Sequence, residues 1–317
     1  MRVVITGGAG FIGYHLANAL LEGGHSVLVY DNMTSAGTER IHHLDGVEFV
    51  RDDILNMARL KAACKDAEAI YHLAAQVSVP YSMEEPSVDF DLNLKGTTNV
   101  LEVARKVGAR VLCASSAAVY GNPRSTPVPE THILSPISFY GLSKRSAELY
   151  CTMYNDAFDL PVTMFRIFNA YGPHCHGVVH DVLRRLSKNP SRLQMLGKPD
   201  ASKDFVYISD VVDAVIAPLK TSDADGAETF NIGSGTPRTI GNLTSQICDI
   251  VGAKPLVTFS GRSWAGDVTE GLCADTSKIS SRFGWKPKIG LREGLERTVQ
   301  WFRLAVGSWQ RLSPLEA

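Results

Sequence analysis

The sequence has almost no excess of charge of either sign. Its 317 residues include 32 lysines and arginines and 33 acidic residues, and the formal net charge is -1 at pH 7. A strong basic excess is what draws a protein to nucleic acid or to an anionic membrane surface. We therefore expect neither nucleic acid nor a membrane as a partner.

Long apolar runs and a secretory leader are also missing. No stretch approaches the roughly 20 consecutive apolar residues that a helix needs to cross a bilayer. Met1 leads directly into an apolar strand, without a basic and then apolar leader. The six cysteines are scattered, with no Cys-x-x-Cys pair, as expected for reduced thiols. These absences predict a cytoplasmic protein.

What is present is an ordinary globular composition, 44% hydrophobic and 21% charged, without a repeat or a flexible linker. Strands and helices alternate up to residue 168, which favours a doubly wound, Rossmann-type α/β domain with a mostly parallel sheet. We expect this domain over 1–168, with parts of 205–235 returning to it, and a smaller α/β lobe over 169–317. The expected strands are 2–6, 25–30, 47–50, 69–75, 110–114, 160–168, 193–196 and 229–232. The longer expected helices are 11–21, 86–107, 139–158, 178–187, 209–219, 241–251 and 291–306. A short helix is also allowed within the polar segment 32–46.

The first thirteen residues, MRVVITGGAGFIG, place a glycine-rich turn between a strand and a helix. Gly7, Gly10 and Gly13 follow the strand, and the apolar face of the helix begins at Phe11. Glycines let a pyrophosphate approach the backbone, and a helix start offers unpaired N–H groups. Such turns also occur for purely structural reasons, but the strand before and the helix after favour a phosphate cradle.

The second strand leads to Asp31, eighteen residues past Gly13. This is close to the spacing at which an acid binds the adenosine ribose through its hydroxyls. With no arginine beside it, the acid favours NAD over NADP, because it would repel a 2′-phosphate. Asp53 follows the third strand, and two roles are open for it: accepting a hydrogen bond from adenine, or capping the next helix.

Three side chains fit proton transfer at a sugar hydroxyl. Tyr140 and Lys144 are four residues apart on one face of the helix 139–158, and Ser116 lies at the end of the strand 110–114. A tyrosine is a poor base at neutral pH, but an ammonium and a positive nicotinamide ring nearby favour the phenolate. Such a phenolate takes a proton from a sugar hydroxyl while the hydride of that carbon passes to NAD⁺, and the serine holds the same oxygen. A Tyr-x-x-x-Lys pair alone is common, so this interpretation depends on the cradle and on Asp31.

These motifs together resemble the extended short-chain dehydrogenase/reductase family. The likeness covers nearly the whole chain and includes TGGAGFIG (6–13), HLAA (72–75), SSAAVYG (115–121), YGLSK (140–144) and FRIFNAYGP (165–173). Within the family the chain is most similar to nucleotide-sugar 4-epimerases of the UDP-galactose 4-epimerase type. The resemblance implies a tightly held NAD, a nucleotide-sugar substrate and a homodimer formed through the helices 86–107 and 139–158.

The resemblance also implies roles for individual residues. The implied catalytic residues are Ser116, Tyr140 and Lys144. The implied NAD contacts are Gly7, Gly10, Phe11, Ile12, Gly13, Asp31, Asn32, Asp53, Ile54, Leu73, Ala74, Ala75, Asn93, Ser115, Tyr140, Lys144 and Phe168. The implied substrate contacts are Ser116, Tyr140, Asn169, Val178, Lys203, Arg262 and Asp267.

Three departures from the family pattern bear on the reaction. Ala117 and Ala118 stand where members that eliminate water carry an acidic pair, which favours epimerisation over 4,6-dehydration. Lys203 replaces the usual arginine, so it retains a charge for phosphate without bidentate geometry. Arg262 lies farther before Gly266-Asp267 than is usual, which is compatible with an unusual sugar or nucleotide.

Histidines offer two further candidate sites. His72 lies inside an apolar strand and is interpreted as a core histidine with hydrogen-bond partners. His174, Cys175, His176 and His180 are residue types that bind metals, but no second Cys/His cluster completes a cage, so we expect no metal.

The sequence thus favours NAD-dependent C4 epimerisation of a UDP-hexose or a UDP-hexuronic acid through a transient 4-keto sugar. Two alternatives stay open. One is a nucleotide-sugar 4-ketoreductase or an atypical dehydratase of the same family, and the other is a noncatalytic NAD-sensing protein.

Overall fold

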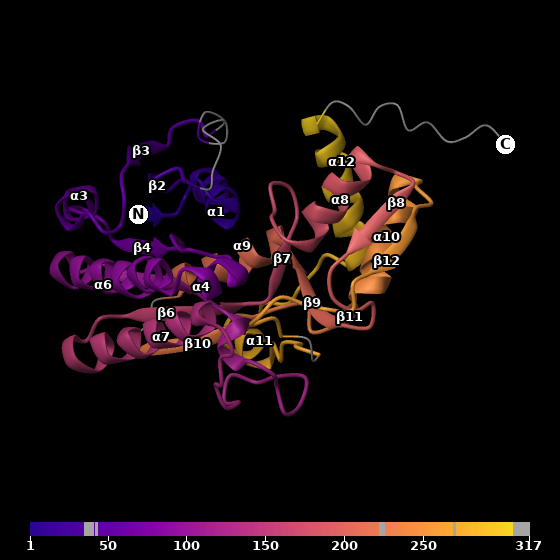
Figure 1. Ribbon diagram of the computed structural model, residues 1–317. Helices are drawn as coiled ribbons and strands as arrows, with labels where there is room; N and C mark the ends of the chain where they lie inside the picture. Colours follow the sequence, from indigo (N-terminus) through magenta and orange to yellow (C-terminus); the bar gives the residue numbers. More distant parts are fainter. Residues whose placement is uncertain (35–40, 42–43, 222–225, 269–270, 307–317) are drawn as a thin grey trace.

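A seven-stranded parallel sheet is built from strands within residues 2–167 and from one later strand, residues 227–232 (Figure 1). The computed structural model describes residues 1–34, 41, 44–221, 226–268 and 271–306, so the short helix allowed within 32–46 falls largely outside the described residues. The strand order is β10-β6-β5-β4-β1-β2-β3, which confirms the doubly wound fold. The strands are β1 (Arg2–Thr6), β2 (Ser26–Asp31), β3 (Glu48–Arg51), β4 (Ala69–His72), β5 (Arg110–Ser116), β6 (Val162–Ile167) and β10 (Ala227–Ile232).

Helices cover both faces of the sheet, because successive strand residues point to opposite sides. Ile5 packs in one buried cluster with Leu16 of α1 and Val211 of α9. Val4 packs in another cluster with Leu101 of α6. The helices on the first face are α1 (Phe11–Glu22) and α9 (Ile208–Ile216), and those on the second are α3 (Met57–Ala63), α6 (Gly96–Val107) and α7 (Phe139–Phe158).

Two of the expected elements differ in the structure. The helix expected over 86–107 is divided into α5 (Pro86–Asp89), a π-helical turn η1 (Phe90–Lys95) and α6. The strand β4 ends at His72 rather than at Ala75, because the backbone after it lines a cavity instead of extending the ladder. The helix expected over 139–158 is confirmed as α7.

The second half of the chain carries two small sheets and a helical layer beside the large sheet (Figure 1). Several of these short elements were not expected from the sequence, since brief strands depend on a partner elsewhere in the chain. The three-stranded sheet is β11 (Pro237–Thr239), β9 (Ser202–Tyr207) and β7 (Asn169–Tyr171), and the two-stranded sheet is β12 (Leu256–Phe259) and β8 (Arg192–Met195). The remaining helical elements are α4 (Val79–Glu84), η2 (Ala117–Tyr120), α8 (Val178–Lys188), η3 (Ala217–Lys220), α10 (Ile240–Val251), α11 (Ser277–Phe283) and α12 (Leu291–Val306).

Within the described part of the chain, no helix combines the length and the apolar character that a membrane span requires.

Candidate active site

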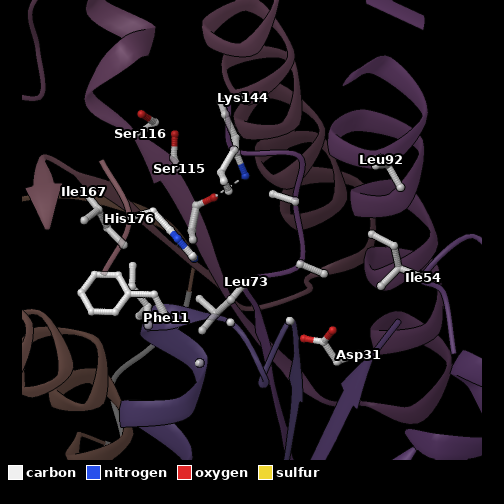
Figure 2. Close-up of a pocket in the computed structure, with 18 of the residues that line it drawn as sticks. Phe11, Asp31, Ile54, Leu73, Leu92, Ser115, Ser116, Lys144, Ile167 and His176 are labelled. Carbon is white, nitrogen blue, oxygen red and sulfur yellow. Dashed lines mark hydrogen bonds between the residues drawn. The ribbon is translucent and has the colours of Figure 1, made fainter. Parts of the chain in front are cut away.

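A cavity of about 380 Å³ opens at the carboxyl ends of β1, β2, β4 and β5 (Figure 2). This is where the strand order reverses, between β1 and β4, and it is the ligand site of open α/β sheets. The expected catalytic residue Ser116 lines it. So do most of the residues expected to contact a dinucleotide: Gly7, Gly10, Phe11, Ile12, Gly13, Asp31, Asn32, Ile54, Leu73, Ala74, Ala75, Ser115, Tyr140, Lys144 and Phe168.

The glycine loop is packed so closely that side chains cannot be added to it. Gly7 has a φ of +73°, and a Cβ on it would lie 2.4 Å from the Ala74 backbone nitrogen. A Cβ on Gly13 would lie 2.3 Å from the Gly7 carbonyl oxygen. Gly10 is the N-cap of α1 and makes no side-chain capping bond, which leaves the N–H groups of the first turn for a ligand. The loop therefore fits the pyrophosphate of a dinucleotide.

Asp31 is connected to the glycine loop as well as to its own turn. Its Oδ2 accepts a hydrogen bond from the Ala9 N–H at 3.0 Å, and its Oδ1 accepts one from the Met33 N–H at 2.8 Å. In Figure 2 the Asp31 carboxylate lies toward the opposite end of the cavity from Ser115 and Lys144. This separation fits a dinucleotide bound with its adenosine ribose at Asp31 and its nicotinamide near Lys144.

Asp53 and Asn93 are placed outside the described lining of the cavity. Asp53 accepts hydrogen bonds from the Leu55 N–H at 2.9 Å and from Asn32 Nδ2 at 2.8 Å. The cap of the following helix is Asn56, so the capping role considered for Asp53 is wrong. Asn93 exchanges two hydrogen bonds with the Gln76 backbone, at 2.9 and 3.0 Å, and so holds the segment that follows β4.

The start of α7 is fixed from two sides, and this positions the tyrosine and the lysine. The Ser138 hydroxyl caps the helix by accepting a hydrogen bond from the Gly141 N–H at 3.0 Å. The Tyr140 N–H donates to the Ser82 hydroxyl of α4 at 3.1 Å. Lys144 is 5% exposed, and its Nζ donates to the Ala114 carbonyl at 3.0 Å (Figure 2).

Chemically, this end of the cavity combines a phenol, an ammonium and a hydroxyl at the end of β5. The Ser116 hydroxyl accepts a hydrogen bond from the Ala118 N–H at 3.2 Å. A buried ammonium acts on neighbouring groups through a weakly screening medium, so Lys144 favours a negative charge beside it. The arrangement fits removal and return of a proton at a substrate hydroxyl.

The residues expected to contact the substrate's nucleotide are absent from the described lining of this cavity. Asn169 Nδ2 donates to the Asp204 carbonyl at 2.9 Å. Lys203 and Asp267 meet in an ion pair, with Nζ 2.7 Å from Oδ1. Arg262 is exposed, and its backbone joins Ser260 and Gly197. Val178 is the first residue of α8.

His72 is confirmed as a core histidine with hydrogen-bond partners. Its Nδ1 lies 2.8 Å from the Thr6 hydroxyl and its Nε2 lies 3.0 Å from the Thr97 hydroxyl. Burial, aided by the charge of Lys144, lowers the pKa of His72 to about 3. The side chain is therefore a neutral part of the core beneath the glycine loop.

The candidate metal ligands point in different directions. His174 packs between Tyr14 and Trp301, with ring centroids 5.0 and 4.6 Å away. His180 packs on Phe302, and His176 lines the cavity (Figure 2). No group of three or more His, Cys, Asp or Glu side chains in the described ranges is arranged to hold a metal ion.

Several cavity residues were not identified from the sequence. Asp52 adjoins Asp53, and His176 lies between the motif 165–173 and Val178, so both had a signal in the sequence. Side-chain direction could not be read from spacing. Besides these two, the unexpected lining residues are Tyr30, Thr34, Val77, Leu92, Ala114, Ile167 and Ala170.

Comparison with known proteins finds relatives that act on nucleotide sugars. Residues 4–298 match the family model described as GDP-mannose 4,6 dehydratase. The UDP-glucose 4-epimerase of Mycolicibacterium smegmatis is 33% identical, over 96% of this chain and 99% of that protein. The UDP-glucuronic acid decarboxylase 1 of Arabidopsis thaliana is also 33% identical, over 96% of this chain and 70% of that protein.

Solved structures agree in fold over almost the whole chain. The UDP-glucose 4-epimerase of Thermotoga maritima, crystallised with UDP-glucose, has a TM-score of 0.91 at 33% identity, covering 96% of this chain and 100% of that one. The UDP-glucuronic acid 4-epimerase of Bacillus cereus, in complex with UDP-glucuronic acid and NAD, has a TM-score of 0.90 at 28% identity, with the same coverage of both chains.

Proposed function

Because the chain belongs to the extended short-chain dehydrogenase/reductase family, whose members include NAD-dependent UDP-sugar enzymes, we propose that it is an NAD-dependent nucleotide-sugar 4-epimerase. Its substrate is a UDP-hexose or a UDP-hexuronic acid. The observation that carries the proposal is the meeting of Ser116, Tyr140 and Lys144 in the cavity that also contains the glycine loop and Asp31.

NAD would be held by the glycine loop, Asp31 and the backbone after β4, and it supplies a reversible hydride acceptor at the sugar C4. Tyr140 takes the proton from the O4 hydroxyl and later returns it, while the Ser116 hydroxyl holds the same oxygen. Lys144, fixed on the Ala114 carbonyl, stabilises the phenolate. The resulting 4-keto sugar turns in the site and is reduced on its other face, so no net oxidation occurs.

The alanines after Ser116 favour epimerisation over elimination of water. Ala117 and Ala118 begin the 3₁₀ turn η2, so the turn has no carboxyl group at either position. A proton could not be removed from C5 by an acidic pair at these positions.

The product distinguishes the proposal from its rivals. Purified protein is incubated, without added cofactor, with UDP-glucose, UDP-N-acetylglucosamine and UDP-glucuronate separately, and the products are identified by NMR. A C4 epimer from any one supports the proposal. A pentose formed with release of CO₂ indicates a decarboxylase, loss of water a dehydratase, and consumption of NAD(P)H a ketoreductase. No conversion of any of these substrates counts against the proposed reaction and favours the NAD-sensing alternative.

We further propose that two copies pair through α7 and the neighbouring turn η1. Leu142, Leu149 and Met153 lie on one face of α7 at helical spacing and are 49%, 59% and 59% exposed. Phe90, on η1, is 55% exposed. Contiguous exposed apolar surface of this kind is typical of an interface.

We also propose that two parts of the chain bind the two ligands. Residues 1–168, joined by β10 from within 205–235, would bind NAD, and residues 169–317 would bind the nucleotide of the substrate. All six cysteines are free thiols and buried, which supports a cytoplasmic location.

A further inference from the structure

A buried ion pair joins α7, the helix that carries Tyr140 and Lys144, to β6, the strand beside β5. Glu148 and Arg166 are 7% and 5% exposed. Arg166 donates from Nε to Glu148 Oε1 at 2.9 Å and from Nη2 to Oε2 at 2.7 Å. This bidentate geometry fixes the relative position of α7 and β6.

The same pair anchors both ends of the segment that carries Ser116. Ser115 lies opposite Arg166 in the parallel β5–β6 register, and its hydroxyl donates to Glu148 Oε1 at 2.5 Å. At the other end of the segment, Arg166 Nη1 donates to the Tyr120 hydroxyl at 2.9 Å. The Tyr120 hydroxyl in turn donates to Asn231 Oδ1 at 2.7 Å. Ser116 therefore lies in the chain between Ser115 and Tyr120, both of which are hydrogen-bonded to the ion pair.

On the helix side, Glu148 is one turn beyond Lys144 and two turns beyond Tyr140. Two hydrogen bonds thus join α7 to the end of β5: Lys144 to the Ala114 carbonyl, and Ser115 to Glu148. The spacing between the tyrosine and the serine depends on this junction.

We propose that Glu148 and Arg166 are positioning residues, whose ion pair holds Ser116 at a fixed distance from Tyr140 and Lys144. This inference rests on the proposed function. A buried ion pair gives little or no net stability over apolar residues of similar volume. A small displacement of a catalytic group, by contrast, lowers the rate strongly. We therefore expect the pair to contribute more to the spacing of the catalytic residues than to the free energy of unfolding.

The first test replaces both charges together, in the double variant Glu148→Leu/Arg166→Met, so that no buried charge is left unpaired. We expect kcat to fall by about 10- to 100-fold, since a displacement near 1 Å costs up to about 100-fold. KM and retained NAD should stay near the wild-type values. The matched control is Arg2→Met/Glu48→Leu, which removes another bidentate pair at the amino ends of β1 and β3 and should leave kcat unchanged.

A second test leaves the ion pair in place and changes only its link to β5. Ser115→Ala removes the hydroxyl that donates to Glu148, whereas Ser115→Thr keeps one. Loss of kcat in the alanine variant and its recovery in the threonine variant supports the proposal, and it does so even where the double variant fails to fold.

Amide hydrogen exchange gives a readout that does not depend on turnover. In the Glu148→Leu/Arg166→Met and Ser115→Ala variants, exchange over residues 115–120 should accelerate while the thermal midpoint changes little. Folded variants with wild-type kcat and wild-type exchange over 115–120 would overturn the inference. A wild-type protein that forms no epimer would instead count against the proposed function. The exchange measurement would still decide whether Glu148 and Arg166 position the segment that carries Ser116.

Discussion

Lys203 Nζ lies 2.7 Å from Asp267 Oδ1, in an ion pair between β9 and the loop that packs against the start of α7. The loop approaches the start of α7 so closely that a Cβ on its Gly266 would lie 2.8 Å from the Ser138 Cβ. Two residues expected to contact the substrate thus contact each other, next to the cap of the helix that carries Tyr140. A substrate diphosphate bound here would share Lys203 with Asp267.

Replacing Lys203 should weaken substrate binding more than catalysis. Lys203→Met removes the cation, and we expect KM for the nucleotide sugar to rise about tenfold, equivalent to about 1.4 kcal/mol, with kcat nearly unchanged. Steady-state kinetics checks this. Lys288→Met is the control, because Lys288 pairs with Asp213 in a similar geometry at an exposed position. An unchanged KM for the Lys203 variant would remove this residue from the substrate site.

Tyr140→Phe should abolish turnover while NAD and nucleotide-sugar binding stay largely intact. The phenylalanine keeps the ring but removes the group that exchanges the O4 proton, a contribution of about 100- to 10,000-fold in rate. Product NMR measures turnover, and calorimetry with the nucleotide sugar measures binding. Retention of most activity would refute the assigned role.

Gly7→Ala should impair both folding and NAD retention. The added Cβ would meet the Ala74 backbone at 2.4 Å, at a φ of +73°. Gly108→Ala is a matched control, because Gly108 has the same φ of +73° and nothing within 4 Å of an added Cβ. Both variants carry the cost of a left-handed backbone, about 1 kcal/mol. Only the Gly7 variant should lose NAD, measured as dinucleotide released on denaturation; equal losses would mean that strain alone is responsible.

The free energy of unfolding should fall at mildly acidic pH because of His72. Its pKa in the folded state is about 3, below the ordinary 6.5, so the unfolded chain binds a proton in a range where the folded chain does not. The stabilisation by neutral His72 is complete above pH 6.5 and is lost as the pH falls towards 3, by about 1.4 kcal/mol per pH unit.

A His72→Asn variant isolates this contribution. Urea unfolding at pH 7.5 and pH 5.0 should show the wild type losing about 2 kcal/mol more than the variant between the two conditions. Carboxylates such as Asp89, whose pKa is raised by burial, are common to both proteins and cancel in the comparison. Equal losses would show that His72 does not titrate as described.

The proposed dimer is tested by charge on the exposed face of α7. Leu149→Glu/Met153→Glu should convert the protein to a monomer in light scattering, because two copies would each bring acidic groups into an apolar contact. Leu304→Glu, at a 77% exposed position on α12, is the control and should leave the oligomeric state unchanged. A wild type that is already monomeric would refute the interface.

Local sequence signals predicted much of the site because they describe short stretches. The glycines 7, 10 and 13 with the strand before and the helix after them indicated the cradle, and the four-residue spacing of Tyr140 and Lys144 placed both on α7. The same reasoning did not show that Asn93, which is expected at the cofactor, also holds the Gln76 backbone. It also did not identify Asp52, which lines the cavity beside the expected Asp53, because neighbouring residues at a strand end point in different directions.

The sequence by itself determined the alternation of strands and helices, the glycine loop and the identity of the reactive side chains, since periodicity and residue chemistry are local properties. Only the tertiary structure decided what surrounds those side chains. The Ser115–Glu148–Arg166 cluster joins β5, α7 and β6, and the Lys203–Asp267 pair joins residues 64 positions apart. Such contacts depend on strand register and helix docking, which the burial of the whole core fixes and no local pattern encodes.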